Sequence, residues 1–198
     1  MYEVELKFSA VDPALVRDRL AALGGVEGPS RDQVDRYFAH PARDFARTDE
    51  ALRLRSDGDR VVITWKGPRI DGATKTRREI ELPLGPLGER PSTTIERWDA
   101  LLHALGFRAV RDVRKRRIPF HLPWRGAPVE VAIDEVDGLG MFVELEQQAL
   151  ADGVDAARQR LQSLASELRC GPAERRSYLE LLLAGMPSPG GMVDTGPG

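Results

Sequence analysis

MYEVELKFSA, residues 1–10, opens the chain and alternates apolar with charged side chains over Glu3-x-Glu5-x-Lys7. Strict alternation is typical of a β-strand, because successive side chains of a strand point to opposite faces. The three charged residues therefore share one strand face, and the apolar residues between them share the other. Such a charged face can contact bulk water or line an enclosed space, and the patterns in the other segments of the chain distinguish these two possibilities.

Seven further segments show strand-like patterns, so we expect about eight strands. They are DRYF (35–38), ALRLRS (51–56), RVVITWKG (60–67), TRREIEL (76–82), VRKRRIPF (113–120), PVEVAIDEV (128–136) and MFVELEQ (141–147). DGD (57–59), between the second and third of these, is a hairpin-turn signal. Four of the eight strands carry acidic or basic side chains on one face only.

Four segments have the amphipathic pattern of helices. They are DPALVRDRLAALGG (12–25), STTIERWDALLHALGF (92–107), DAARQRLQSLASELR (155–169) and PAERRSYLELLLAG (172–185). Asp12 is the expected N-cap of the first helix, and Ser92 or a following threonine that of the second. Residues 186–198 are rich in proline and glycine, which predicts a disordered tail after one domain over residues 1–185.

Composition narrows the function classes. The chain has 198 residues, is 41% hydrophobic and carries a formal net charge of −2, so it lacks the basic field typical of nucleic-acid-binding proteins. Cys170 is the only cysteine, which excludes an intrachain disulfide and favours a reducing cytoplasm. No apolar run approaches the roughly 20 residues of a membrane span, and a charged strand stands where a signal peptide would be. We therefore expect a cytoplasmic protein that binds neither nucleic acid nor membrane.

The helices must bury their apolar stripes, and the apolar strand faces are their best partners. The charged strand faces then point away from the helices, and in a closed barrel they point into the lumen. Enclosed charges of both signs are costly unless ions or ligands satisfy them. Carboxylates suit Mg²⁺ or Mn²⁺, and arginine and lysine suit phosphate oxygens, so the pattern indicates a polyphosphate carried with a divalent metal.

Each charged strand face, taken alone, is more typical of a solvated sheet surface. The repetition of the pattern favours enclosure instead. The charged faces comprise Glu3, Glu5, Lys7, Arg53, Arg55, Lys66, Arg77, Glu79, Glu81, Lys115, Arg117, Glu144 and Glu146.

The ordered motifs resemble those of the CYTH family, also called triphosphate tunnel metalloenzymes, and within it the class IV adenylate cyclase-like subgroup. The matching motifs are EVELK (3–7), DRYF (35–38), LRLR (52–55), TWKGP (64–68), RREIEL (77–82), VRKRR (113–117), IDEVDGLGMFVELE (133–146) and SYLELL (177–182). They run in family order over nearly the whole chain. The resemblance implies an α+β fold in which an eight-stranded antiparallel barrel forms a tunnel, with helices packed outside.

The resemblance also implies roles for individual residues. The metal-binding carboxylates would be Glu3, Glu5, Glu144 and Glu146, with Asp134 nearby and Glu79 and Glu81 as second-metal ligands or partners of the basic groups. The phosphates would be gripped by Arg53, Arg55, Lys66, Lys115 and Arg117, with Arg77 joining them. Lys7, beside Glu5, would be the catalytic lysine that orients the terminal phosphate or the attacking water.

Such a site needs no serine or histidine nucleophile, because phosphoryl transfer is catalysed mainly by positioning and charge stabilisation. The motifs leave two reactions open: hydrolysis of tripolyphosphate, ATP or thiamine triphosphate, and cyclisation of ATP to cyclic AMP and pyrophosphate. A non-catalytic polyphosphate or nucleotide sensor on the same fold is the alternative, and either a monomer or a homodimer is compatible with the sequence.

Tyr37 is a candidate to restrain Lys7, with a buried aromatic role as the other interpretation. The stripe of residues 178–183 is interpreted as core packing.

Overall fold

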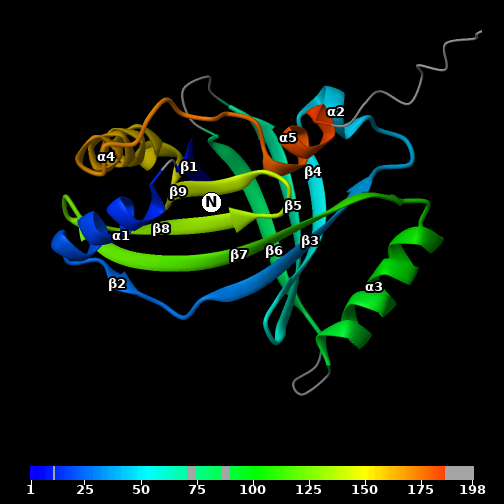
Figure 1. Cartoon of the computed structure of the whole chain (residues 1–198). Coiled ribbons are helices and arrows are strands. Elements are labelled where there is room, and N and C mark those ends of the chain that lie inside the picture. The colour runs from blue at the N-terminus through cyan, green and yellow to red at the C-terminus, as the bar shows by residue number, and fades with distance from the viewer. Residues whose placement is uncertain (11, 71–74, 86–89, 186–198) are drawn as a thin grey trace, which may run out of the picture.

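The computed structural model describes residues 1–10, 12–70, 75–85 and 90–185. The expected disordered tail, residues 186–198, lies outside the described residues. The fold is α+β, with a closed eight-stranded antiparallel barrel, one extra short strand and helices on the outside of the barrel (Figure 1). The sequence-based expectation of the barrel is confirmed.

The strands are β1 (Tyr2–Ser9), β2 (Val26–Glu27), β3 (Arg31–Ala39), β4 (Ala51–Asp57), β5 (Arg60–Arg69), β6 (Arg77–Leu84), β7 (Arg108–Trp124), β8 (Ala127–Val136) and β9 (Gly140–Ala149). The helices are α1 (Pro13–Ala22), α2 (Phe45–Thr48), α3 (Pro91–Ala104), α4 (Val154–Glu167) and α5 (Tyr178–Ala184), with a 3₁₀ turn at Ala151–Gly153. The DGD turn joins β4 to β5, and its Gly58 takes a φ of +60°, a conformation that glycine adopts without steric cost.

The barrel closes because β7 is long enough to pair with two neighbours. Its first part pairs antiparallel with β3, and its second part pairs antiparallel with β8. The remaining strands follow in the order β3-β4-β5-β6-β1-β9-β8, and the extra strand β2 adds to the outer edge of β7. Strand alternation then divides all eight barrel strands into a luminal and an outer face.

The outer faces carry the apolar core. On β1, Val4, Leu6 and Phe8 are buried in a cluster with side chains of α1 and α4. A second outer cluster joins Leu54 of β4 to α2 and α3. A third cluster lies on the luminal side instead, where α5 packs against Val113 of β7 and Phe142 of β9, which share strand faces with Lys115 and Glu144. Figure 1 shows the result: α1 and α4 lie together on one side of the barrel, and α3 lies on the other. The charged strand faces are thereby turned inward.

Two helix boundaries differ from the prediction. The last helix begins at Tyr178 rather than near residue 172, because Ser177 and Glu180 form a capping box that fixes its start. The expected cap of the second helix is also wrong: α3 begins at Pro91, and its N-cap residue Arg90 makes no side-chain cap bond. In the part of the chain that the structure describes, no helix combines the length and apolar character needed to cross a membrane.

Candidate active site in the barrel lumen

Two cavities occupy the lumen. A large cavity of about 680 Å³ opens where β3 ends, beside α2 and α5, and a small cavity of about 190 Å³ lies where β3 begins. Both are lined by a shared central set, Glu3, Arg53, Arg55, Arg117 and Glu146. The lumen is therefore a charged passage between two ends of the barrel.

Carboxylates gather along the β1–β9 seam of this passage. Glu5 lies directly opposite Glu146, and Lys7 lies directly opposite Glu144. Burial, together with the charges of Glu3 and Glu5, raises the pKa of the Glu146 carboxyl well above its usual range. Burial likewise raises the pKa of Glu3, although Lys66 opposes this shift. The seam concentrates negative charge that a cation would stabilise.

These carboxylates have the oxygen donors that Mg²⁺ and Mn²⁺ prefer. As they stand, no three His, Cys, Asp or Glu side chains among the described residues form a group that could hold a metal ion. Lysines occupy part of the donor set, since Glu3 pairs with Lys66 and Glu5 pairs with Lys75 at 2.7 Å. The donor chemistry of Glu3, Glu5 and Glu146 nonetheless fits a hard divalent cation, whose charge would offset their crowding.

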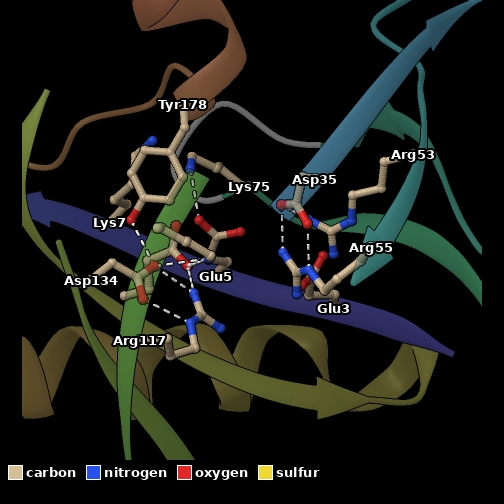
Figure 2. Close-up of polar contacts among 12 residues, drawn as sticks. Glu3, Glu5, Lys7, Asp35, Arg53, Arg55, Lys75, Arg117, Asp134 and Tyr178 are labelled. Carbon is tan, nitrogen blue, oxygen red and sulfur yellow. Dashed lines mark hydrogen bonds and ion pairs between the residues drawn. The ribbon is translucent and has the colours of Figure 1, made fainter. Parts of the chain in front are cut away.

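One basic group of the lumen is organised by Asp35, which the sequence interpretation did not single out. The Asp35 carboxylate accepts hydrogen bonds from Arg55 at 2.6 and 2.7 Å and from Arg53 at 3.2 Å (Figure 2). Burial alone would raise the pKa of Asp35, but Arg55 and Arg53 outweigh it and hold that pKa well below its usual range. Asp35, which itself lines the large cavity, thus fixes the two guanidiniums side by side.

Asp134 organises a second basic group in the same way. It is fully buried, and it accepts hydrogen bonds from Lys115 at 2.9 Å, Arg117 at 2.7 and 2.8 Å, and the Tyr178 hydroxyl at 3.0 Å. Arg117 also contacts Glu144. Because three donors already surround Asp134, and it does not line either cavity, its position suits a partner of the basic residues better than a metal ligand.

Lys66 and Lys75 face the carboxylates of β1 and β6. Lys66 pairs with Glu3 and, at 3.0 Å, with Glu79, so the predicted Lys66 and Glu79 meet across the β5–β6 ladder. Lys75 is buried and was not predicted. It donates to Glu5, and it lies just before β6 rather than in a strand.

Lys7 is almost fully enclosed, with 1% of its surface exposed. Its Nζ donates to the Arg176 carbonyl and lies 4.1 Å from the centroid of the Tyr178 ring (Figure 2). Burial, reinforced by the nearby charge of Lys75, lowers the pKa of Lys7 to about 7. Among the described residues, the aromatic rings over Lys7 Nζ are those of Tyr178 and, at 5.5 Å to the centroid, Phe142, and not that of Tyr37, so the core-packing interpretation of the 178–183 stripe is incomplete.

Two predicted residues lie at the margins of the site. Arg77 is buried and lines the large cavity, with its guanidinium 3.7 Å from Asp49. Glu81 is exposed, accepts a hydrogen bond from Thr64 at 3.1 Å, and lines only the small cavity. The structure therefore brings together most of the predicted residues and leaves Glu81 at the rim.

The open end of the large cavity has a different character. Apolar and aromatic side chains gather there among charged ones such as Arg43 and Glu50, contributed by the end of β3, the α2 region and α5. The residues concerned are Phe38, His40, Pro41, Phe45, Leu52, Leu179 and Leu183. A charged passage thus leads directly into a half-apolar chamber.

Comparisons with known proteins agree with this architecture. The family model described as the CYTH domain matches residues 1–178. A Methanocaldococcus jannaschii protein that carries the provisional name adenylate cyclase is 35% identical over 185 residues, which cover 91% of this chain and 98% of that protein. The solved structure of the PH1819 protein from Pyrococcus horikoshii is 36% identical, has a TM-score of 0.78, and is matched over 92% of this chain and 98% of that one.

A more distant structure shares the fold. A Hippeastrum protein, provisionally named an adenylyl cyclase and described as having a dominant triphosphatase activity, gives a TM-score of 0.61 at 18% identity. The match covers 95% of this chain and 97% of the Hippeastrum chain.

Proposed function

The chain belongs to the CYTH family, and on that premise we propose that it is a metal-dependent enzyme that breaks a phosphoanhydride bond of an organic triphosphate such as ATP. The observation that carries this proposal is the continuity between the charged lumen and the half-apolar chamber at its open end. The lumen suits a chain of phosphates, and the chamber suits a ring-bearing group attached to it. Tripolyphosphate would use only the first of these features.

The basic residues would grip the phosphates. Arg53 and Arg55 present planar guanidiniums that can bind phosphate oxygens in pairs, and Asp35 holds both in place. Arg117 adds a third guanidinium and Lys115 an ammonium group from β7, and Asp134 holds both. Because these cations are already positioned, little reorganisation is needed when charge develops on the reacting phosphate.

Glu3, Glu5 and Glu146 would hold Mg²⁺ or Mn²⁺, with Glu144 beside them. The bound metal would supply a Lewis acid that offsets phosphate charge. Lys7, opposite Glu144 on β1, would orient the reacting phosphate or the attacking oxygen once its Nζ exchanges the Arg176 carbonyl for the substrate. The attacking oxygen is that of water in hydrolysis and that of the ribose 3′-hydroxyl in cyclisation, and the lumen can accommodate either.

The test is a product assay with three substrates. The purified chain is offered ATP, thiamine triphosphate and tripolyphosphate with Mg²⁺ or Mn²⁺, and phosphate, pyrophosphate and cyclic AMP are resolved. We expect a kcat/KM for ATP or thiamine triphosphate at least tenfold above that for tripolyphosphate. Binding of ATP without any product would instead support the non-catalytic sensor.

A substitution in the chamber distinguishes its contribution to substrate binding from that of the lumen. Leu183 lines the large cavity yet is 43% exposed, so Leu183→Ser should fold normally. It should raise the KM for ATP several-fold and leave tripolyphosphate kinetics unchanged. Leu105→Ser, at a 60% exposed position after α3, is the matched control. If Leu183→Ser changes the KM values for ATP and tripolyphosphate equally, the chamber does not recognise the organic group of the substrate.

A further inference from the structure

Residues 173–177, in the connection between α4 and α5, form a strap that lies against Lys7. The strap begins in an isolated antiparallel bridge to β1, and its Glu174 amide donates to the Lys7 carbonyl at 2.7 Å. The Lys7 Nζ in turn donates to the Arg176 carbonyl. The strap therefore contacts both the main chain and the side chain of Lys7, on its way from α4 to α5 (Figure 1).

The strap leads directly into α5, whose first residue covers Lys7. The centroid of the Tyr178 ring lies 4.1 Å from the Lys7 Nζ. Ser177, the last residue of the strap, is the N-cap of α5, and its amide donates to the Glu180 carboxylate. A shift of the strap or of Glu180 would therefore also move the ring that lies over Lys7.

Arg69, at the end of β5, holds this segment in place through a single guanidinium. That group donates to the Arg175 carbonyl of the strap at 2.8 Å and to the Glu180 carboxylate at 3.2 Å. It also donates to Asp49, the residue that follows α2, at 2.6 and 2.8 Å. A guanidinium can bridge several acceptors because its donors form a planar fork, whereas a lysine ammonium is a compact point charge.

These contacts of Arg69 have a cost as well as a benefit for stability. Arg69 lies directly opposite Arg77 on the β5–β6 ladder, and like charges in that position destabilise a sheet. Asp49, 3.7 Å from the Arg77 guanidinium, offsets part of this repulsion. The ion pair with Glu180 is partly exposed, and such pairs contribute little to stability. The distinctive effect of Arg69 is thus its hold on the strap.

We propose that Arg69 is a positioning residue that fastens the strap, and through it the Tyr178 ring, over Lys7. When the Lys7 Nζ leaves the Arg176 carbonyl for the substrate, the Glu174 amide and the Tyr178 ring still support Lys7. Without Arg69 the strap would open, and Lys7 would lose these supports. The consequence for catalysis rests on the proposed function, whereas the fastening of the strap does not.

Hydrogen–deuterium exchange of the full chain, without substrate or metal, tests the fastening. In Arg69→Gln the strap amides should exchange faster by about tenfold or more, while the amides of β1 and β9 keep their wild-type rates. Arg69→Lys should also accelerate exchange, because an ammonium cannot replace the fork. Arg17→Gln, which breaks a two-bond pair with Glu27 between α1 and β2, is the matched control. Unchanged strap exchange in Arg69→Gln, or equal acceleration in β1 and β9, would overturn the proposal.

Steady-state kinetics with ATP test the effect on Lys7. Arg69→Gln should lower kcat by about tenfold and change KM less than about twofold, because the phosphate-gripping residues are untouched. In a Lys7→Met background the same substitution should lower kcat no further, since residues that act through one another are not additive. Equal losses in both backgrounds would show that Arg69 does not act through Lys7. If the wild type turns over no triphosphate, the proposed function fails, and the exchange experiment alone decides whether Arg69 fastens the strap.

Discussion

Glu5 and Glu146 face each other across the β1–β9 ladder inside a closed barrel, and the pKa of Glu146 is raised by burial and by the charges of Glu3 and Glu5. Two carboxylates in this arrangement destabilise the folded protein unless a cation joins them. Lys75 offsets part of this cost by pairing with Glu5 at 2.7 Å, and the proposed metal would offset the rest.

The first prediction follows from this crowding. Glu146→Gln removes one charge while keeping shape, so the metal-free protein should be as stable as the wild type or more stable. The free energy of unfolding, measured in urea with EDTA present, checks this. Adding Mg²⁺ should stabilise the wild type more than the variant, because ligands stabilise the state that they bind. A marked loss of metal-free stability would show that Glu146 has a structural partner.

Substitution of Asp35 should instead lower the free energy of unfolding. Asp35→Asn leaves Arg53 and Arg55 without their buried counter-charge, and breaking a buried pair typically costs about 3 to 5 kcal/mol. Asp32→Asn, the exposed neighbour on β3, is the control and should change stability little.

The cost of Asp35→Asn should also depend on pH. The pKa of Asp35 is lower in the folded than in the unfolded chain, so its contribution is complete above the unfolded value of about 3.9 and is lost as pH falls below it. The stability difference between wild type and variant, measured from pH 7 down to pH 3, should be constant at first and then shrink. A difference that grows towards low pH would contradict the ion-pair account.

Tyr178 makes two contacts that substitution can separate. Tyr178→Phe keeps the ring over Lys7 and removes the hydroxyl that donates to Asp134, which should cost about 1 kcal/mol of stability. Tyr178→Leu removes the ring as well and should lower kcat further. Thermal unfolding and steady-state kinetics of the two variants distinguish these effects. Equal kinetics in both would show that the ring does not position Lys7.

Lys7 is predicted to act on the transition state more than on binding. Lys7→Met keeps an apolar stem in the buried position, so folding should persist. Its kcat should fall about a hundredfold or more, while the affinity for a non-hydrolysable ATP analogue with Mg²⁺ changes little. If KM rises at constant kcat, Lys7 is only another phosphate-binding residue, and the reaction lies elsewhere in the lumen.

The sequence predicted the barrel because alternation is a local property that each strand displays by itself. The apolar faces of the strands pack against helices, so the charged faces of β1, β4, β5, β7 and β9 are left to share the lumen. The same alternation explains why Lys115 and Arg117 are buried in the lumen whereas Arg114 and Arg116 are exposed.

The residues that were missed are those whose role depends on a distant partner. Asp35 lies in a quoted motif and shares the parity of Tyr37, yet only the β3–β4 register reveals its contact with Arg53 and Arg55. Lys75 lies outside the alternating strands, so its approach to Glu5 has no local signal. Tyr178 sits in an apolar helix pattern that does not distinguish a core residue from one whose ring covers Lys7.

The central claim is that the carboxylates of the lumen serve a metal-dependent reaction on an organic triphosphate. Steady-state turnover of ATP with Mg²⁺ or Mn²⁺, compared between the wild type and Glu146→Gln, tests it most directly. The account predicts a turnover lower by about a thousandfold in Glu146→Gln, equivalent to roughly 4 kcal/mol of transition-state stabilisation, in a protein at least as stable as the wild type. Turnover of ATP by Glu146→Gln at the wild-type rate would contradict it.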